Sequence, residues 1–249
     1  AGLWRQARAL RAQKFAAALV FPKGFREALL MRLAGIPVRC GLATDRRSWL
    51  LSHAIPFTKE DWNRHHALQF GQVLAPLGVE MSQQPTSFPL NCEDLEEADR
   101  VLKDTGIKGA FAAFHIAASK APRAWHAERF GEVGARLFRA AGLRPVLLGT
   151  PGEASFHSAF REVCPEAVDL AGKTSLRGMA AVLKQARIFV GNDSGPMHLA
   201  AAVGTPVAAV FGPGSPLKTA PWAPPERVRT LWAGLPCSPC RQAFWKECS

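Results

Sequence analysis

Apolar and polar positions follow a regular order in the second half of the chain. From residue 109 onward, apolar runs of strand length alternate with stretches whose apolar residues recur at helical spacing. Strands that are apolar throughout and alternate with helices indicate a parallel sheet covered on both faces. The expected strands are 110–116, 145–148, 167–170, 188–190 and 207–211, and the expected helices are 127–140, 153–163, 175–185 and 196–203.

The first part of the chain shows the same alternation with fewer elements. Helices and strands are expected in turn over 3–13, 16–21, 25–33 and 38–42, with a further helix over 60–77. Residues 83–90 carry two prolines and no regular period, which favours a connection, and a helix is expected next over 93–103. We therefore predict two α/β domains, residues 1–90 and 91–249.

Composition places the chain among globular proteins. Hydrophobic residues make up 48% of its 249 residues and charged residues 20%. No apolar run of about 18 residues predicts a transmembrane helix, and no signal peptide is recognisable. Six cysteines in a chain of this length do not indicate a disulfide framework, so a reducing, cytosolic compartment is expected.

The net charge of +11 suits an anionic partner, which could be nucleic acid, a phosphorylated substrate or an acidic membrane surface. An Arg-rich, Ala-rich host composition explains the same charge equally well. The chain has no dense Lys/Arg cluster interleaved with aromatic residues and no tyrosine, which argues against a nucleic-acid groove. We expect no nucleic-acid partner.

The stretch 191–202 is the most informative part of the sequence. It reads Gly-Asn-Asp-Ser-Gly-Pro-Met-His-Leu-Ala-Ala-Ala, and it lies between an expected strand and an expected helix. The free N–H groups and the positive dipole end of such a helix form an anion site, which predicts a bound diphosphate. Asp193 would repel a phosphate but would accept hydrogen bonds from sugar hydroxyls. A well-capped helix after a buried strand would give the same pattern without any ligand.

The motif Asn-Asp-Ser-Gly-Pro-Met-His-Leu-Ala-Ala-Ala (192–202), with Gly-Thr-Pro (204–206) and Phe-Gly-Pro (211–213) after it, resembles the signature of glycosyltransferase family 9. Residues 123–130 are similar to the family's Lys-Arg-Trp-Pro-x-Glu-x-Phe pattern. Residues 170–176 resemble the lipopolysaccharide heptosyltransferase II branch, and 15–41 resemble the end of the family's first domain. The resemblance implies a GT-B fold with two Rossmann-like domains and parallel sheets, the first domain being incomplete.

The resemblance also implies an activity. It is the inverting, metal-independent transfer of heptose from ADP-heptose to the phosphorylated inner core of lipopolysaccharide. ADP-heptose is then the donor substrate, no cofactor is expected, and the enzyme would be cytoplasmic with peripheral contact to the inner membrane. Two alternatives stay open: a GT-B glycosyltransferase that uses another nucleotide sugar, and a noncatalytic relative that binds anionic lipid.

Site residues carry over from the family by position. Asp193 would hold the hydroxyls of the donor sugar. The backbone of Ser194, Gly195, Pro196 and Met197 would face the diphosphate, although Pro196 offers no N–H.

Four further residues come from the same carry-over. Arg123 would neutralise the diphosphate, with Lys120 as a nearby alternative. Glu153 would accept the ribose hydroxyls, although an acidic residue in the first turn of a helix needs no ligand. His198, one helical turn beyond the motif, would either contact the ligand or pack in its helix.

The carry-over leaves the general base unassigned. In the family this base is an Asp in a Gly-Asp turn near the N-terminus, and neither Asp45 nor Asp61 stands in such a motif. We therefore expect an N-terminally truncated chain that lacks about seventy residues of an ordinary domain and does not catalyse by itself. The loop Lys-Gly-Phe-Arg (23–26) also departs from the family's Asn-Ser-Phe-Lys.

Three cysteines lie close together at the end of the sequence. Cys237, Cys240 and Cys248 resemble a Cys-rich loop of the same branch. Such spacing fits a structural metal, a disulfide or free thiols, and the residues alone do not choose among them.

Overall fold

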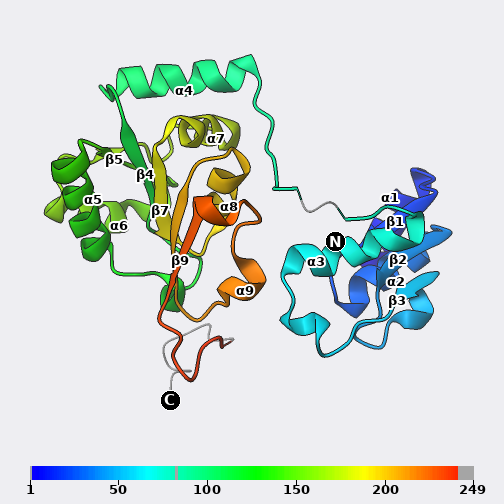
Figure 1. The fold of residues 1–249 in the computed structure, drawn as a ribbon. Coiled ribbons are helices and arrows are strands. Elements are labelled where there is room, and N and C mark those ends of the chain that lie inside the picture. Colours follow the sequence, from blue (N-terminus) through cyan, green and yellow to red (C-terminus); the bar gives the residue numbers. More distant parts are fainter. Residues whose placement is uncertain (1, 82–83, 241–249) are drawn as a thin grey trace. The chain divides into compact units, whose positions relative to one another are not determined.

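The computed structural model describes residues 2–81 and 84–240. It divides into two compact units, residues 1–83 and 84–249 (Figure 1). Each unit has a parallel sheet packed against helices, which confirms the α/β class predicted from the sequence. No helix within the two described ranges combines the length and the apolar character needed to cross a bilayer.

The first unit is built on a three-stranded parallel sheet in the order β1-β2-β3. Its helices α1 and α2 pack against each other, and one face of the sheet buries Val20 and Leu50 while the other buries Cys40 and Val73. The bounds are α1 Leu3–Ala12, β1 Ala17–Val20, α2 Phe25–Leu33, β2 Val38–Leu42, β3 His53–Ile55 and α3 His66–Gly71, with short 3₁₀ turns at Ser48–Leu50, Asp61–Asn63 and Gln72–Leu77.

The continuous helix expected over 60–77 is wrong. Asp61 accepts hydrogen bonds from the Thr58 backbone N–H at 2.9 Å and from the Thr58 hydroxyl at 3.1 Å, which favours a local turn over a helix. Arg64 then takes up extended backbone (ψ 159°), and Pro76 lacks the N–H that a helix interior needs. Strand β3 was not predicted because three residues carry too little periodicity to be recognised.

The second unit has six parallel strands in the order β6-β5-β4-β7-β8-β9. The strands are β4 Phe111–His115, β5 Arg144–Leu147, β6 Val168–Asp169, β7 Ile188–Asn192, β8 Val207–Phe211 and β9 Val228–Trp232. The helices are α4 Cys92–Asp104, α5 Ala127–Ala141, α6 Ala154–Val163, α7 Leu176–Gln185, α8 Gly195–Ala202 and α9 Pro216–Thr219, with 3₁₀ turns at Ala121–Arg123, Pro151–Glu153 and Pro225–Arg227. The sequence did not predict β9, in which half-buried and exposed positions alternate at the edge of the sheet, or the short α9.

Both faces of this sheet are covered, as a parallel sheet requires. Alternate residues of β4 point to opposite faces, so Phe111 packs in one core and Phe114 in the other. Helices α4, α7 and α8 cover the first face, and α5 and α6 cover the second (Figure 1). Arg177 on α7 donates to both carboxylate oxygens of Asp94 on α4, with N–O distances of 2.8 and 2.5 Å, and so ties two covering helices together.

The connection before α4 belongs with the second unit. The backbone N–H of Thr86 donates to the Trp222 carbonyl at 3.0 Å, and that of Phe88 donates to the Ala202 carbonyl at 3.0 Å. These contacts explain why the second unit starts at Gln84, ahead of the boundary expected at residue 91.

Close packing of α5 on α6 gives the first testable prediction. A Cβ at Gly131 would lie 2.7 Å from the Phe160 carbonyl oxygen and 2.9 Å from the Val163 Cβ. Overpacking at Gly131→Ala should cost about 1–3 kcal/mol of the free energy of unfolding. The better helix propensity of alanine offsets roughly 1 kcal/mol of this cost, so a net loss of up to about 2 kcal/mol is expected. Urea unfolding of both proteins measures the difference.

Glu132→Ala is the matched control, since Glu132 is the exposed next residue of the same helix. It should change the free energy of unfolding by less than about 0.5 kcal/mol. A Gly131→Ala protein as stable as the wild type would show that α5 and α6 are not held in this close contact.

Candidate functional site

The carboxyl ends of neighbouring strands meet at one edge of the second sheet. Strand β4 ends at His115, β7 ends at Asn192, and the loop after β5 reaches Glu153. In open α/β sheets, ligands bind outside these strand ends. The structure therefore gathers Asp193, Ser194, Arg123 and Glu153 around one edge, although they are far apart in the sequence.

The buried amide of Asn192 fastens the Arg123 segment to this edge. Its Nδ2 donates to the Ile116 carbonyl at 2.7 Å, and its Oδ1 accepts the Trp125 backbone N–H at 3.0 Å. Gly212, at the end of β8, lets the same segment come close, because a Cβ there would lie 2.8 Å from the Pro122 carbonyl oxygen. The loop after β4 is thus held by two hydrogen bonds to Asn192 at the end of β7, and it packs closely against Gly212 just after β8.

Asp193 and Arg123 form a loose ion pair at the centre of the site. Arg123 Nη1 lies 3.8 Å from Asp193 Oδ2, and the side chains are 41% and 10% exposed respectively. Burial raises the pKa of Asp193, and the positive charge of Arg123 opposes this only in part. Gly214 leaves room for the carboxylate, since a Cβ there would lie 2.6 Å from Oδ2.

The Arg123 guanidinium has an unpaired hydrogen-bond donor. Its Nε is buried and has no partner among the described residues. A buried donor without an acceptor is costly, and a ligand anion at this point would satisfy it.

Helix α8 presents two backbone donors beside this pair. Ser194 is its N-cap in extended conformation, and its hydroxyl lies 3.2 Å from His115 Nδ1 instead of capping the helix. The described residues supply no acceptor for the N–H groups of Ser194 and Gly195. Above Gly195 the surroundings of a Cβ would be open, so a ligand can approach the backbone.

The rest of the expected run is placed differently. The Met197 N–H donates to the Ser194 carbonyl at 3.2 Å, and the Met197 side chain is fully buried in the core. Pro196 has no N–H, so only Ser194 and Gly195 of the four expected residues have a free backbone N–H for a diphosphate. His198 lies exposed on α8, and its charge lowers the pKa of Asp193.

Glu153 lies where the sequence placed it, in a local capping arrangement. Its Oε2 accepts the Thr150 backbone N–H at 2.9 Å in a capping box. The same oxygen lies 3.6 Å from Nε2 of His115. This contact shows that Glu153 faces the strand ends.

His115 is the site residue that the sequence analysis missed. It is 7% exposed, and burial lowers its pKa although Glu153 opposes this effect, so the ring is neutral at neutral pH. Its signal in the sequence was a titratable residue near the end of an apolar strand, at the edge where ligands bind.

Lys120 is not part of the gathered group. It precedes the 3₁₀ turn Ala121–Arg123, its side chain is exposed, and its carbonyl accepts the Arg123 N–H at 2.9 Å. Within the described part of the chain, no hydrogen bond or ion pair joins its ammonium group to Asp193.

The cysteine segment passes close to the same edge. Ser238 Oγ donates to the Gly212 carbonyl at 3.3 Å, and the Cys240 N–H donates to the Pro213 carbonyl at 3.0 Å. Cys237 and Cys240 are free thiols, and no metal-ligand cluster occurs among residues 2–81 and 84–240. Cys248 lies outside the described residues, so a metal site that includes it stays a prediction.

A second polar group lies at the carboxyl edge of the first sheet. The Lys23 ammonium lies 4.7 Å from the ring centre of Phe57 and 4.3 Å from that of Trp62, and it donates to the Gln69 side-chain oxygen. Aromatic faces attract a cation at this distance, so the Lys23 side chain is held in place.

The fully buried Arg47 fixes the loop that carries Lys23. Its Nε donates to the Leu42 carbonyl at 3.0 Å, and its Nη1 donates to the Gly24 carbonyl at 2.8 Å and to the Pro22 carbonyl. These bonds tie the end of β2 to the loop after β1.

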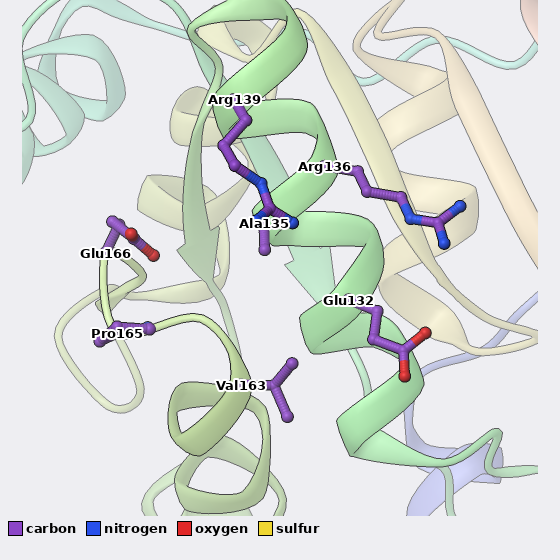
Figure 2. A pocket seen from close by; sticks show the side chains of 7 residues that line it. All are labelled: Glu132, Ala135, Arg136, Arg139, Val163, Pro165 and Glu166. Carbon is purple, nitrogen blue, oxygen red and sulfur yellow. The ribbon is translucent and has the colours of Figure 1, made fainter.

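A hollow of about 240 Å³ lies between α5 and the segment after α6. Figure 2 shows the side chains that line it, among them Arg136 and Arg139 from α5 and Glu166 from the loop before β6. The hollow includes none of the residues gathered at the strand ends, so it is separate from the candidate site.

Comparisons with known proteins agree with this arrangement. The family model of glycosyltransferase family 9 (heptosyltransferase) matches residues 3–247. Lipopolysaccharide heptosyltransferase 2 of Salmonella typhimurium is 28% identical over 245 residues, which are 92% of this chain and 69% of that protein. Lipooligosaccharide heptosyltransferase 2 of Haemophilus influenzae is 27% identical over 251 residues, 93% of this chain and 70% of that protein.

Solved structures share the fold. A family 9 glycosyltransferase from Veillonella parvula superposes with a TM-score of 0.79 at 24% identity, covering 93% of this chain and 66% of that one. The ADP-heptose lipopolysaccharide heptosyltransferase II of Escherichia coli superposes with a TM-score of 0.72 at 24% identity, covering 92% and 72%. The GT-B fold expected from the sequence is confirmed, and the chain spans roughly two thirds of the length of these relatives.

The burial of Asp193 gives a prediction for stability. Because its pKa is raised in the folded protein, wild-type stability falls as the pH rises through that pKa. Asp193→Asn should therefore raise the free energy of unfolding at pH 7 by up to about 1 kcal/mol, since solvent and Arg123 screen part of the cost. The gain should vanish at about pH 3, which lies below the ordinary pKa of an aspartate, because the wild-type carboxyl is protonated there. Urea unfolding at both pH values measures it.

Asp94→Asn is the control of opposite sign. The hydrogen bonds from Arg177 hold the pKa of Asp94 below its ordinary value, so this substitution should lower stability at pH 7. If both substitutions change stability in the same direction, burial of Asp193 is not what raises its pKa.

Proposed function

This chain belongs to glycosyltransferase family 9, and from that premise we propose that it serves the transfer of heptose from ADP-heptose to the inner core of lipopolysaccharide. The relatives that match it along more than nine tenths of its length carry the names of lipopolysaccharide or lipooligosaccharide heptosyltransferases. The single observation that carries the proposal is the Asp193–Arg123 pair at the N-terminus of α8.

The diphosphate of the donor lies at the N-terminus of α8 in this proposal. The N–H groups of Ser194 and Gly195 and the helix dipole favour an anion there. The guanidinium of Arg123 adds a full positive charge and a buried Nε–H that needs an acceptor. Among the proposed residues, Ser194 and Gly195 supply the free backbone donors, and Arg123 supplies the cation beside them.

The donor sugar lies against Asp193. A carboxylate that burial has deprived of water gains from hydroxyl donors, and two neighbouring sugar hydroxyls supply them. Arg123 then lies between sugar and phosphate, where it compensates both the carboxylate and the leaving diphosphate. Positive charge at the departing phosphate is what the breaking glycosidic bond requires.

The nucleoside extends towards β5. Glu153 is fixed by the Thr150 N–H and by its nearness to His115, and it accepts the ribose hydroxyls in this proposal. The first unit binds the phosphorylated acceptor, and the ammonium of Lys23 is its contact with an acceptor phosphate.

Removing the Arg123 charge tests the placement of the diphosphate. Arg123→Met keeps the length of the side chain and should weaken ADP binding about 10- to 100-fold, the usual worth of a charge-assisted hydrogen bond. It should weaken adenosine binding much less. Calorimetric titration of the 249-residue chain measures both affinities.

The control is Arg136→Met, an exposed arginine of α5 in the separate hollow (Figure 2). It should bind ADP like the wild type. Arg123→Met with wild-type affinity for ADP would refute the placement, and a wild-type preference for UDP would refute the ADP-sugar donor.

With this acceptor, we propose that the protein works at the cytoplasmic face of the inner membrane and is held there by its charge. The net charge of +11 supports attraction to an anionic bilayer surface. The chain should sediment with vesicles that contain phosphatidylglycerol in about 0.05 M salt and stay in solution in about 0.5 M salt, where charges are screened. Vesicles of phosphatidylcholine are the control, and failure to sediment with the anionic vesicles at low salt would contradict the proposal.

A further inference from the structure

His115 lies between the two parts of the candidate site that belong to different loops. Its Nδ1 is 3.2 Å from the Ser194 hydroxyl, in the turn that starts α8, and its Nε2 is 3.6 Å from Glu153 Oε2, in the loop after β5. The ring is 7% exposed and sits at the end of the central strand β4. His115 thus has a polar contact with both Ser194 and Glu153.

The partners of the ring determine its tautomer. A carboxylate can only accept, so the nearby Glu153 favours the tautomer with the proton on Nε2. In that neutral tautomer Nδ1 is an acceptor, and the Ser194 hydroxyl is in reach to donate to it. The hydroxyl hydrogen of Ser194 then points towards His115. In the proposed complex, the Ser194 backbone N–H and not its hydroxyl therefore donates to the diphosphate.

The Glu153 carboxylate lies close to Gly149 and to two histidines. Gly149 lies beneath the carboxylate, since a Cβ there would be 2.1 Å from Glu153 Oε2 and 3.3 Å from His157 Nε2. The Nδ1 of the buried His157 lies 2.8 Å from Asp169 Oδ1, and its Nε2 has no hydrogen-bond partner among the described residues. The 3.6 Å contact with His115 is longer than a hydrogen bond, and ligand binding commonly tightens such contacts in an empty site.

We propose that His115 is a positioning residue: its Nε2–H orients the Glu153 carboxylate for the ribose hydroxyls, and its Nδ1 orients the Ser194 hydroxyl beside the diphosphate. This inference rests on the proposed ADP-sugar donor. His115 itself touches neither the sugar nor the phosphate, and it acts through its two neighbours.

Two substitutions separate the two contacts. In His115→Asn, the side-chain amide takes the place of Nδ1 and cannot reach Glu153. In His115→Gln, the amide takes the place of Nε2 and makes no hydrogen bond with the Ser194 hydroxyl. The readout is the ratio of affinities for ADP and 2′-deoxy-ADP, measured by calorimetry on the whole chain. The wild type should prefer ADP about tenfold, since a buried carboxylate left without its hydroxyl donor loses at least one hydrogen bond.

The expected results differ between the variants. Glu153→Gln and His115→Asn should both reduce the preference to within twofold, and the double variant should lose nothing further. His115→Gln should keep most of the preference. His126→Asn is the control and should behave like the wild type, because His126 is exposed and its side chain does not cap α5.

Equal loss in His115→Asn and His115→Gln, or wild-type preference in His115→Asn, would overturn the proposal. The tautomer of His115 can be measured without a nucleotide, from the ¹⁵N NMR signals of its ring in the unliganded chain. The Nε2–H tautomer is expected, and it should be lost or weakened in Glu153→Gln. An Nδ1–H tautomer would overturn the proposal, whereas failure of the wild type to bind ADP would overturn the proposed donor and leave the NMR result to decide the role of His115.

Discussion

The whole site depends on the side-chain amide of Asn192, which joins the end of β7 to the loop that follows β4. One end of the amide holds the carbonyl of Ile116 just after β4, and the other holds the N–H of Trp125 two residues beyond Arg123. Because the amide is fully buried, both bonds are shielded from water, and losing either would leave a buried polar group unsatisfied. Parallel pairing of β4 with β7 brings Asn192 next to the end of β4, and its amide fixes the course of the loop that follows β4.

This arrangement places charge where the fold alone would not. Asp193 is kept in a site that raises its pKa, with Arg123 at 3.8 Å as a loose partner, whereas Asp94 forms a close two-point contact with Arg177. The contrast separates two uses of an acidic residue. Asp94 stabilises the packing of α4 on α7, while Asp193 is held at a cost in stability, as residues that await a ligand often are.

The sequence was most reliable where local chemistry decides the structure. The glycine and proline of the motif at 191–202 place a turn between a buried strand and a helix, so the position of Asp193 could be predicted from neighbouring residues alone. Strands β4, β7 and β8 are apolar over most of their length and were predicted within a few residues. The family resemblance at 123–130 also brought Arg123 to the same site, a pairing that spacing does not reveal.

What the sequence could not supply depends on tertiary contacts. His115 resembles any polar residue at the end of a strand until β4, β5 and β7 are aligned and it reaches both Ser194 and Glu153. Met197 belongs to the motif, but only the packing of α8 shows that its side chain enters the core. The break of the helix expected over 60–77 follows from one capping aspartate and one proline, whose effects a period of apolar residues does not register.

The most direct test of the account is a crystal structure of this chain with an ADP-sugar bound. The account predicts the diphosphate at the N–H groups of Ser194 and Gly195 with the guanidinium of Arg123 against it, and the sugar hydroxyls on Asp193. A nucleotide bound in the hollow beside α5, or bound at the strand ends with its base on α8 and its sugar away from Asp193, would contradict it.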